Sequence, residues 1–136
     1  MITAVDSNVL LDILVGDPSF GPGSRMAVRE SLAKGVVVAC EVVWAEVTAA
    51  FPQTAAGAAA LGELGVEFQA LTQPEAELAA QAWRLYRQAG GPRERLLPDF
   101  LVGAHASSRV DRLLTRDRGF YRRWFDGLRV LDPSSG

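Results

Sequence analysis

The sequence predicts an α/β fold in which helices cover both faces of a parallel sheet. Short apolar runs of strand length alternate with longer helical patterns along the whole chain, and this order is typical of parallel sheets. Hydrophobic residues make up 49% of the chain and charged residues 22%, the balance of a folded globular domain rather than a disordered chain. At 136 residues, we expect one domain, residues 1–136, with a frayed tail at residues 133–136.

In the first half of the chain, each expected strand leads into a helix. Ser7 or Asn8 can cap the helix after the first apolar run, and that helix ends before Pro18. Gly35 stops a later helix, and the β-branched run after it predicts a second strand. Pro52 ends or bends the next helix. The expected elements are a strand at 2–5, a helix at 9–17, a loop at 20–24, a helix at 25–34, a strand at 36–40 and helices at 41–51 and 54–65.

The second half repeats the alternation. The run VEFQAL alternates and predicts a short strand. The helix after it has Pro74 and acids in its first turn and arginines in its last turn, which suits the helix dipole. Asp99 opens a helix that is apolar nearly all round and is therefore expected to be buried. The expected elements are a strand at 66–71, a helix at 73–91, a basic loop at 92–98, a helix at 99–110, a strand at 112–115, a short helix at 116–125 and a strand at 128–131.

Charge is distributed unevenly along the chain. The net formal charge is −7 over residues 1–83 and +5 over residues 84–136. The near-neutral total of −2 therefore does not exclude a polyanionic partner, because local fields matter more than totals. All basic residues except Lys34 are arginine. Arginine suits phosphate recognition, but a compositional bias of the genome is the simpler explanation of the high ratio of arginine to lysine.

Four acids stand out because of the elements that flank them. Asp6 directly follows the first strand, and Asp117 follows the fourth. Glu46 lies one turn into the helix after the second strand, at the border of its apolar stripe. Asp99 begins the buried helix after Pro98. In open parallel sheets, ligands bind beyond the carboxyl ends of the strands, so all four acids fall where a site is expected.

Each of these acids also has an ordinary structural explanation. Asp99 suits a helix N-cap, Asp6 suits an Asx-turn and Glu46 suits a partly solvated helix face. Asp117 has an arginine on either side of it in the sequence and could form an ion pair with one of them. Together the four are harder to explain in this way, since carboxylates that converge on one pocket repel each other. A hard divalent cation such as Mg²⁺ or Mn²⁺ is the usual compensation.

With these residues, the chain resembles the PIN domain family, and within it the small VapC-type toxin ribonucleases of prokaryotic toxin–antitoxin pairs. The resemblance covers essentially the whole chain. It is carried by the segments AVDSNVLLDIL, WAEV, PDFLVGAHA and LLTRDRGFYRRW. No single one of these motifs is specific, because an acid after a strand is common. Four of them in this order, in a chain of this length, carry the assignment.

The resemblance implies a three-layer α/β/α fold with a sheet of about five strands in the order 3-2-1-4-5. It places the family's acidic quartet on Asp6, Glu46, Asp99 and Asp117, and its small hydroxyl residue on Thr115. Ser7 and Asn8 match the polar pair after the first acid. The resemblance also implies Mg²⁺- or Mn²⁺-dependent endoribonuclease activity, homodimerisation and inhibition by a VapB-type antitoxin whose C-terminal segment covers the active-site groove.

The residue types predict metal-assisted hydrolysis of a phosphodiester. One ion held by Asp6, Asp99 and Asp117 would activate a water molecule and polarise the phosphate, while Glu46 shares the ion or orients the water. Ser7 and Thr115 are expected to hold the carboxylates in place. Because this chemistry does not use the 2′-hydroxyl as nucleophile, it predicts 5′-phosphate and 3′-hydroxyl ends. Some family members carry a further acid near the fourth position, and here arginines take those places, so one or two ions remain possible.

Arginines near the last two acids are candidates for contacts with RNA phosphates. They are Arg93, Arg95, Arg116, Arg118, Arg122 and Arg123. The alternative for each is a solvated arginine or a partner for a nearby acid. The aromatic residues between them could stack on a base, but packing on the sheet is the expected role of Phe120 and Trp124.

The remaining chemistry-bearing residues have structural interpretations. His105 is expected to pack or to form a local hydrogen bond, and Cys40 to lie in the core, so serine–histidine hydrolysis and a zinc site are disfavoured. Trp44 and the Ala-rich segment at residues 54–61 fit either an apolar dimer or antitoxin surface or a core contact. The single cysteine, the lack of a signal-peptide pattern and the absence of a membrane-length apolar run predict a cytoplasmic protein with no membrane partner.

Three other functions remain as alternatives. A phosphotransfer domain would need paired acids near the first strand, a D-x-D nucleophile motif or a P-loop, and the chain has none of these. A catalytically silent binding module of the same fold would not need the quartet. A DNA or flap-type nuclease of the same fold would keep the acids and differ in its substrate.

Overall fold

Five strands form one parallel sheet in the order β3-β2-β1-β4-β5 in the computed structural model, which describes residues 1–92 and 95–134. The strands are β1 (Ile2–Val5), β2 (Val36–Ala39), β3 (Val66–Phe68), β4 (Arg112–Leu114) and β5 (Val130–Leu131). β1 lies at the centre, paired in parallel with β2 on one side and β4 on the other. The expected α/β fold and its strand order are therefore confirmed.

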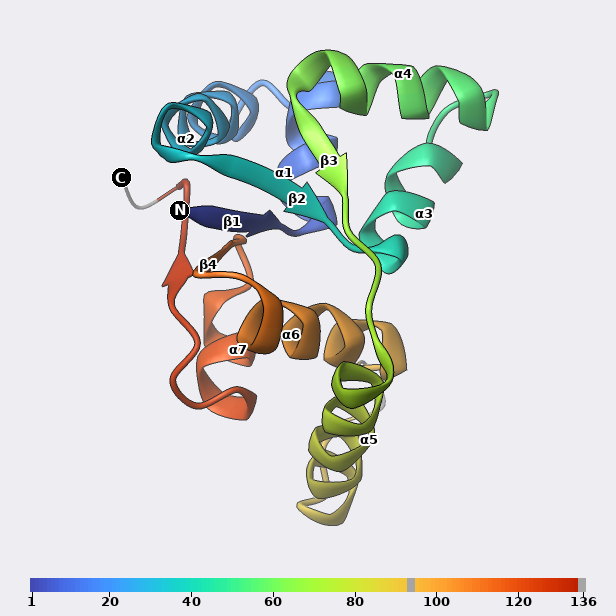
Figure 1. The fold of residues 1–136 in the computed structure, drawn as a ribbon, viewed down its shortest axis with the longest axis vertical. Helices are drawn as coiled ribbons and strands as arrows, with labels where there is room; N and C mark the ends of the chain where they lie inside the picture. The colour runs from blue at the N-terminus through green and yellow to red at the C-terminus, as the bar shows by residue number, and fades with distance from the viewer. Residues whose placement is uncertain (93–94, 135–136) are drawn as a thin grey trace.

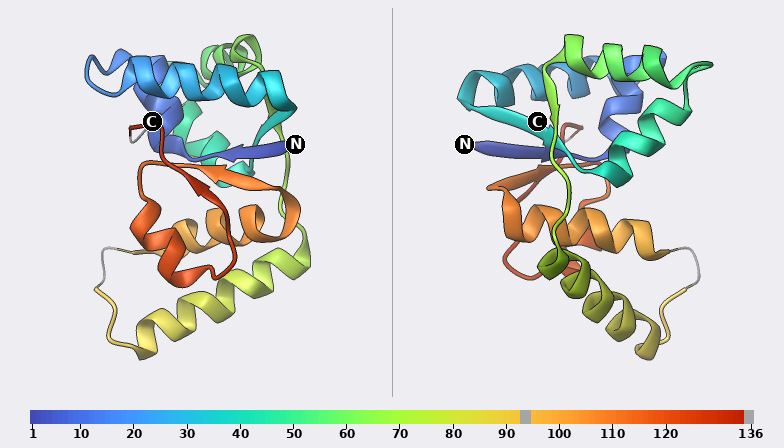
Figure 2. Two further views of the ribbon diagram at one scale, coloured as in Figure 1. Left: turned by 90° about the vertical axis from the view of Figure 1, so that its left-hand side faces the viewer. Right: turned by 45° about the vertical axis from the view of Figure 1, so that its right-hand side comes forward.

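Helices cover both faces of this sheet. In the described residues they are α1 (Ser7–Leu11), the π-helix η1 (Asp12–Gly16), α2 (Gly21–Lys34), α3 (Glu41–Ala49), α4 (Thr54–Leu64), α5 (Gln73–Gln88), α6 (Leu97–Arg109) and α7 (Arg118–Trp124). α1 to α4 lie on one side of the sheet and α5 to α7 on the other (Figures 1 and 2). This division follows from topology, because the chain moves outward from β1 to β3 and then returns to β4, and right-handed crossovers in opposite directions fall on opposite faces.

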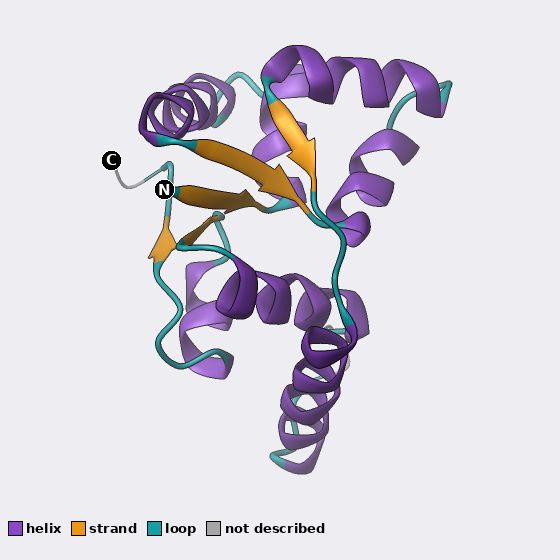
Figure 3. Ribbon diagram, in the orientation of Figure 1, coloured by secondary structure: helices purple, strands orange, loops and turns teal. Residues whose placement is uncertain are grey.

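The reversal of direction places β1 beside β4, and this is the topological switch point of the sheet. All neighbouring strands pair in parallel, and the arrows of β1, β2 and β3 in Figure 3 point toward the same edge of the sheet. β1, β2 and β4 are buried over most of their length, so their side chains pack on helices from both faces. The core they form fixes the backbone up to the last residue of each strand. Side chains just beyond Val5 and Leu114 are thus held at one edge.

Two helices begin earlier than the sequence predicts. The segment expected to be a loop at residues 20–24 forms the first turn of α2, and α6 begins at Leu97 rather than at Asp99. A proline near each start, Pro22 and Pro98, explains both errors, because proline fits the first turn of a helix, where its missing N–H is not needed. Asp99 is consequently the third residue of α6 and not its N-cap.

The helix expected at residues 9–17 is not a single α-helix. It divides into α1 and the π-helix η1, whose first residue is Asp12. The Asp12 side chain is buried and accepts hydrogen bonds from Ser24 Oγ at 3.0 Å and from Arg116 Nε at 2.8 Å. These contacts draw Asp12 inward at the point where the helix widens.

The two edge strands are shorter than predicted. β3 ends at Phe68, opposite Ala39, because its neighbour β2 ends there. β5 has two residues that pair with the end of β4. Beyond β3 the chain crosses to α5, which packs against α6 at the far side of the molecule (Figure 1). No helix in the described part of the chain is long and apolar enough to cross a membrane.

Candidate active site

The candidate site lies at the carboxyl ends of β1 and β4. Asp6 follows β1, and its backbone N–H donates to the carbonyl of Leu114 over 2.9 Å, which continues the ladder past both strands. Only 7% of the Asp6 surface is exposed. Thr115 and Asp117 follow β4 at the same edge. Parallel pairing of the two strands therefore brings together residues that are more than a hundred positions apart in the sequence.

The Asp6 carboxylate accepts four hydrogen bonds. The Ser7 backbone N–H donates to Oδ1 over 2.8 Å. Thr115 Oγ1 and the Tyr121 hydroxyl donate to Oδ2 over 2.8 and 3.1 Å, and Asn8 Nδ2 lies 3.5 Å from the same oxygen. Three of these donors were expected around the first acid. Tyr121 was not, because its place among the aromatic residues of α7 indicates packing and gives no sign of a polar contact.

Asn8 and Thr115 connect the segments that follow β1 and β4. Asn8 Nδ2 donates to Thr115 Oγ1 over 3.4 Å, and Asn8 Oδ1 accepts from the Arg116 backbone N–H over 3.2 Å. Thr115 Oγ1 also accepts from the Asp117 backbone N–H over 3.0 Å. These bonds connect the backbone that carries Asp117 to the segment that carries Asp6.

Burial dominates the electrostatics of Asp6. It raises the pKa of the Asp6 carboxyl above 3.8, against the hydrogen bonds from Thr115, Ser7 and Tyr121, and the charge of Asp99 raises it further. The pKa of Tyr121 is raised well above 10.0, first by burial and then by the charge of Asp6. Tyr121 therefore remains a hydrogen-bond donor at neutral pH.

Glu46 approaches this cluster from α3. Burial raises the pKa of its carboxyl, a hydrogen bond with the Ser7 side chain opposes the shift, and the charges of Asp6 and Asp99 add to it. The residue as a whole remains exposed to solvent. Glu46 is thus within electrostatic reach of two other acids of the quartet while it remains accessible to a ligand.

Asp99 faces the cluster from the first turn of α6. Its Oδ2 accepts from the Leu96 backbone N–H over 3.3 Å, so from the third position of α6 it satisfies the N–H of the N-cap residue. Burial raises the pKa of the Asp99 carboxyl, the Leu96 bond and the charge of Arg95 lower it, and the charge of Asp117 raises it. Asp99 therefore has a capping role and is also coupled electrostatically to Asp6, Glu46 and Asp117.

Asp117 is engaged by an arginine from a distant part of the sequence. Arg95 forms a two-pronged ion pair with it, in which Nη2 donates to Oδ1 over 2.9 Å and Nη1 contacts Oδ2. The Arg95 guanidinium also lies over the Phe120 ring, 4.4 Å from its centroid. The two arginines next to Asp117 in the sequence have other partners. Arg116 pairs with Asp12 at 2.8 Å, and Arg118 lies 3.7 Å from Asp132.

The other arginine candidates for RNA contacts have varied surroundings. Arg93 lies outside the described residues. Arg116 lies over the Phe20 ring at 4.0 Å, in addition to its ion pair with Asp12. Arg122 and Arg123 are exposed on α7, with Arg123 5.3 Å from the Trp124 ring centroid. Their contact with RNA remains a prediction.

His105 and Cys40 have the structural roles expected of them. Both are buried, at 1% exposure each. His105 Nε2 forms a hydrogen bond of 2.8 Å with Gln69 Oε1, and burial lowers its pKa. Burial raises the pKa of the Cys40 thiol. Phe120 is likewise buried against Phe100, which confirms its packing role.

The donor chemistry of the quartet suits a hard divalent cation, because four carboxylates with mutually unfavourable charges meet at one edge of the sheet. No group of three acids, histidines or cysteines is yet close enough to hold a metal ion among residues 1–92 and 95–134. Asp117 is paired with Arg95, and the Oδ2 atom of Asp6 already accepts from Thr115 and Tyr121. The residue types therefore fit a metal ion, and binding one requires rearrangement of these side chains.

Comparison with known proteins places this geometry in a family. The model of the PIN domain matches residues 3–125. The chain belongs to the PIN domain family. No curated protein matches the chain in sequence at a significant level.

Solved structures of related fold come from toxin–antitoxin complexes. One is VapBC-1 from nontypeable Haemophilus influenzae, with 17% identity, a TM-score of 0.74, and 98% of this chain and 99% of that chain covered. VapBC2 from Rickettsia felis, bound to a DNA fragment from its promoter, has 18% identity, a TM-score of 0.71 and coverages of 97% and 98%. FitAcB from Neisseria gonorrhoeae has 22% identity, a TM-score of 0.67 and 98% of both chains covered. These likenesses show that the PIN fold extends over nearly the whole chain.

Proposed function

We propose that this PIN domain is a divalent-metal-dependent endoribonuclease and the toxin of a VapBC-type pair. The proposal is supported by the placement of Asp6 and Asp117 at the switch point of the sheet and by the charge effects of Asp99 on Asp6 and Glu46 and of Asp117 on Asp99. PIN domains are generally nucleases, and the similar structures come from VapBC and FitAB complexes. Function as a toxin is therefore the simplest joint account of site and fold.

One Mg²⁺ or Mn²⁺ ion would be held by Asp6, Asp99 and Asp117. Glu46 would either share this ion or orient the attacking water. The site would take one or two ions. When bound, such an ion supplies an activated water and polarises the phosphate. The chain's own residues prepare the site for this. Thr115 and Tyr121 hold the Asp6 carboxylate in one orientation, and Ser7 links the Asp6 segment to Glu46. Hydrolysis at this site would leave 5′-phosphate and 3′-hydroxyl ends.

The proposed partners are RNA, a VapB-type antitoxin and a second copy of the chain. A candidate apolar surface is formed by Trp44 and Phe68, whose rings meet edge to face at 5.4 Å. Phe68 is 53% exposed, so a partner could still cover it. Sedimentation of the purified chain, with and without the antitoxin, measures whether it pairs with a second copy or with the antitoxin.

Cleavage of RNA by the purified chain tests the proposal. End-labelled RNA should be cut with Mg²⁺ or Mn²⁺ and remain intact in EDTA, and the new ends should accept ligation as 5′-phosphates. Asp6→Asn and Asp99→Asn should each reduce the rate by more than about a hundredfold, beyond the usual effect of residues that only support a ligand. Glu63→Gln, an exposed acid on α4, is the matched control and should cleave normally.

The alternative functions predict different results. Intact RNA with both ions, together with unchanged antitoxin binding, would indicate a silent binding module. Cleavage of DNA without RNA would indicate a DNA or flap-type nuclease. Ends that carry 2′,3′-cyclic phosphate would rule out the proposed hydrolysis, because they require the 2′-hydroxyl as nucleophile.

A further inference from the structure

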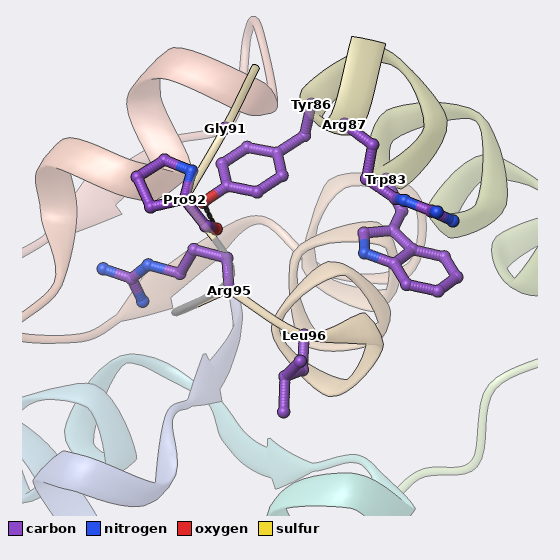
Figure 4. A pocket seen from close by; sticks show the side chains of 7 residues that line it. All are labelled: Trp83, Tyr86, Arg87, Gly91, Pro92, Arg95 and Leu96. Atoms are coloured by element: carbon purple, nitrogen blue, oxygen red, sulfur yellow. Dashed lines mark hydrogen bonds between the residues drawn. The ribbon is translucent and has the colours of Figure 1, made fainter. Parts of the chain in front are cut away.

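A pocket of about 390 Å³ lies where α5 ends and the chain turns toward α6. Figure 4 shows Trp83, Tyr86 and Arg87 on the α5 side and Pro92, Arg95 and Leu96 on the other. This volume falls in the range of small-molecule sites. The acidic quartet does not line the pocket, and none of the roles assigned above accounts for it.

The floor of the pocket is closely packed. Tyr86 is 5% exposed and packs on Phe100 at 5.3 Å and on Trp124 at 5.1 Å between ring centroids. Its hydroxyl donates to the Pro92 carbonyl. A Cβ atom on Gly91 would lie 2.5 Å from the Tyr86 ring, so the backbone passes over the ring as closely as glycine allows. The pocket is therefore held open by packing and does not depend on exposed side chains alone.

The walls combine an aromatic surface with positive charge. Arg87 lies 5.0 Å from the Trp83 ring centroid, and the Arg95 side chain lines the other side of the pocket with its guanidinium pointing away from Trp83 (Figure 4). Leu96, 60% exposed, adds an apolar lip. An aromatic ring beside one guanidinium group, with a second arginine at the edge of the pocket, is a combination suited to a base and a phosphate of a single-stranded nucleic acid.

Arg95 links this pocket to the acidic quartet. Its guanidinium contacts Asp117 by both Nη atoms, while the residue also lines the pocket. Arg95 is thus common to the pocket and to the ion pair with the fourth acid. A phosphate that reaches Arg95 would compete with Asp117 for the same guanidinium.

We propose that this pocket binds a nucleotide of the RNA substrate beside the bond that is cut. Trp83 stacks on the base, and Arg87 and Arg95 bind the flanking phosphates. This inference rests on the proposed ribonuclease function and extends it to a substrate subsite. The two guanidinium groups and the continuity with the quartet favour a nucleotide over an apolar side chain of a protein partner.

The test measures RNA binding without catalysis. The probe is a short fluorescein-labelled single-stranded RNA that the wild-type protein cleaves, titrated in EDTA and followed by anisotropy. Trp83→Ala should weaken binding by about tenfold or more, as expected for loss of one base stack, and Trp83→Phe should restore most of it. Arg87→Ala should weaken binding and reduce its salt dependence. Arg29→Ala, an exposed arginine on α2, is the control for simple loss of charge.

Photocrosslinking locates the nucleotide directly. RNA that carries 4-thiouridine should crosslink to the α5 peptide containing Trp83 and Tyr86, and circular dichroism should show that each variant is folded. Unchanged affinity of the Trp83 and Arg87 variants, with no crosslink to α5, would overturn the subsite and leave the ribonuclease function standing. If the wild-type protein cleaves no RNA, both fall. Lost antitoxin binding with normal RNA affinity would assign the pocket to a protein partner and overturn the inference.

Discussion

Arg95 holds the Asp117 carboxylate with both terminal nitrogens, and Nη2 donates to Oδ1 over 2.9 Å. The pair joins the segment before α6 to the segment after β4 and is about one-third exposed on each side. A guanidinium thus provides the positive charge that a metal ion would provide to the fourth acid of the quartet. Arg95 and the proposed ion are therefore expected to compete for Asp117.

Removal of Arg95 should consequently tighten metal binding. An exposed ion pair of this kind contributes up to about 1 kcal/mol, which corresponds to a gain in Mg²⁺ or Mn²⁺ affinity of about two- to fivefold for Arg95→Ala. Isothermal titration calorimetry without RNA measures it. Arg122→Ala, on the exposed side of α7, should change the affinity little. Equal or weaker binding by Arg95→Ala would show that the arginine does not compete.

Tyr121 should stabilise the protein through its hydroxyl as well as its ring. Tyr121→Phe keeps the contacts with Phe120 and Phe125 and removes only the bond to Asp6. We expect the free energy of unfolding, measured by urea denaturation without metal, to fall by about 1–2 kcal/mol. A double-mutant cycle with Asp6→Ala, which removes the acceptor, isolates the pair. Strictly additive effects of the two changes would mean that the hydroxyl acts elsewhere.

Much of this site could be predicted from the sequence because its positions are set by local order. Asp6 directly follows a buried strand, and Thr115 and Asp117 directly follow another. Parallel pairing of adjacent strands then brings such residues together, whatever the loops do. The starts of α2 and α6 were misplaced for the opposite reason, since a proline there fits equally well in a loop or in a first helical turn.

The rest of the site depends on tertiary contacts that no local pattern records. Tyr121 lies among aromatic residues of α7, and nothing in that run distinguishes the ring that donates to Asp6. Arg95 is one of several arginines, and its partner lies twenty-two positions away. Asp12 has the spacing of a solvent-facing helix acid, yet Arg116 and Ser24 draw it inside. Pairings between charged side chains far apart in sequence are chosen by the folded backbone.

Gly103 should be essential for the packing of the helix that carries Asp99. A Cβ atom at this buried position of α6 would lie 2.2 Å from the Phe125 ring. Gly103→Ala should therefore lower the free energy of unfolding by about 1–3 kcal/mol, the usual effect of overpacking. Gly62→Ala in α4 is the matched control, because nothing lies within 4 Å of the added Cβ. It should raise stability by about 0.5–1 kcal/mol, and a loss of stability in both variants would argue against the steric explanation.

Asp99 should contribute to function and not to stability at neutral pH. Burial raises the pKa of its carboxyl, so the ionised form is less favourable in the folded protein than in the unfolded chain. Asp99→Asn keeps an oxygen for the Leu96 N–H and removes that charge. The melting temperature without metal should stay the same or rise while RNA cleavage is lost. A fall of more than about 4 °C, which is near 1 kcal/mol for a domain of this size, would show that the charge stabilises the fold.

The quartet should also make stability and metal binding respond to pH in opposite directions. The pKa values of Asp6, Glu46 and Asp99 are raised above their ordinary values of 3.8, 4.5 and 3.8. The protonated carboxyls are therefore more favourable in the native state than in the unfolded chain. Their contribution to stability is fully present at a pH below the ordinary pKa values, and it is lost as the pH rises through the raised pKa values of the native state. Metal affinity should increase over the same window, because the ion needs ionised carboxylates.

Urea denaturation and metal titration across this window test the two trends together. The comparison protein is the triple variant Asp6→Asn, Glu46→Gln and Asp99→Asn, which lacks all three groups. Glu75 is kept in both proteins because its lowered pKa, caused first by the Thr72 hydrogen bond, contributes stability in the opposite sense. The stability difference, wild type minus variant, should fall as the pH rises. A difference that stays level or grows would show that the three acids are not held at unfavourable charge, and the electrostatic basis for a metal site would be lost.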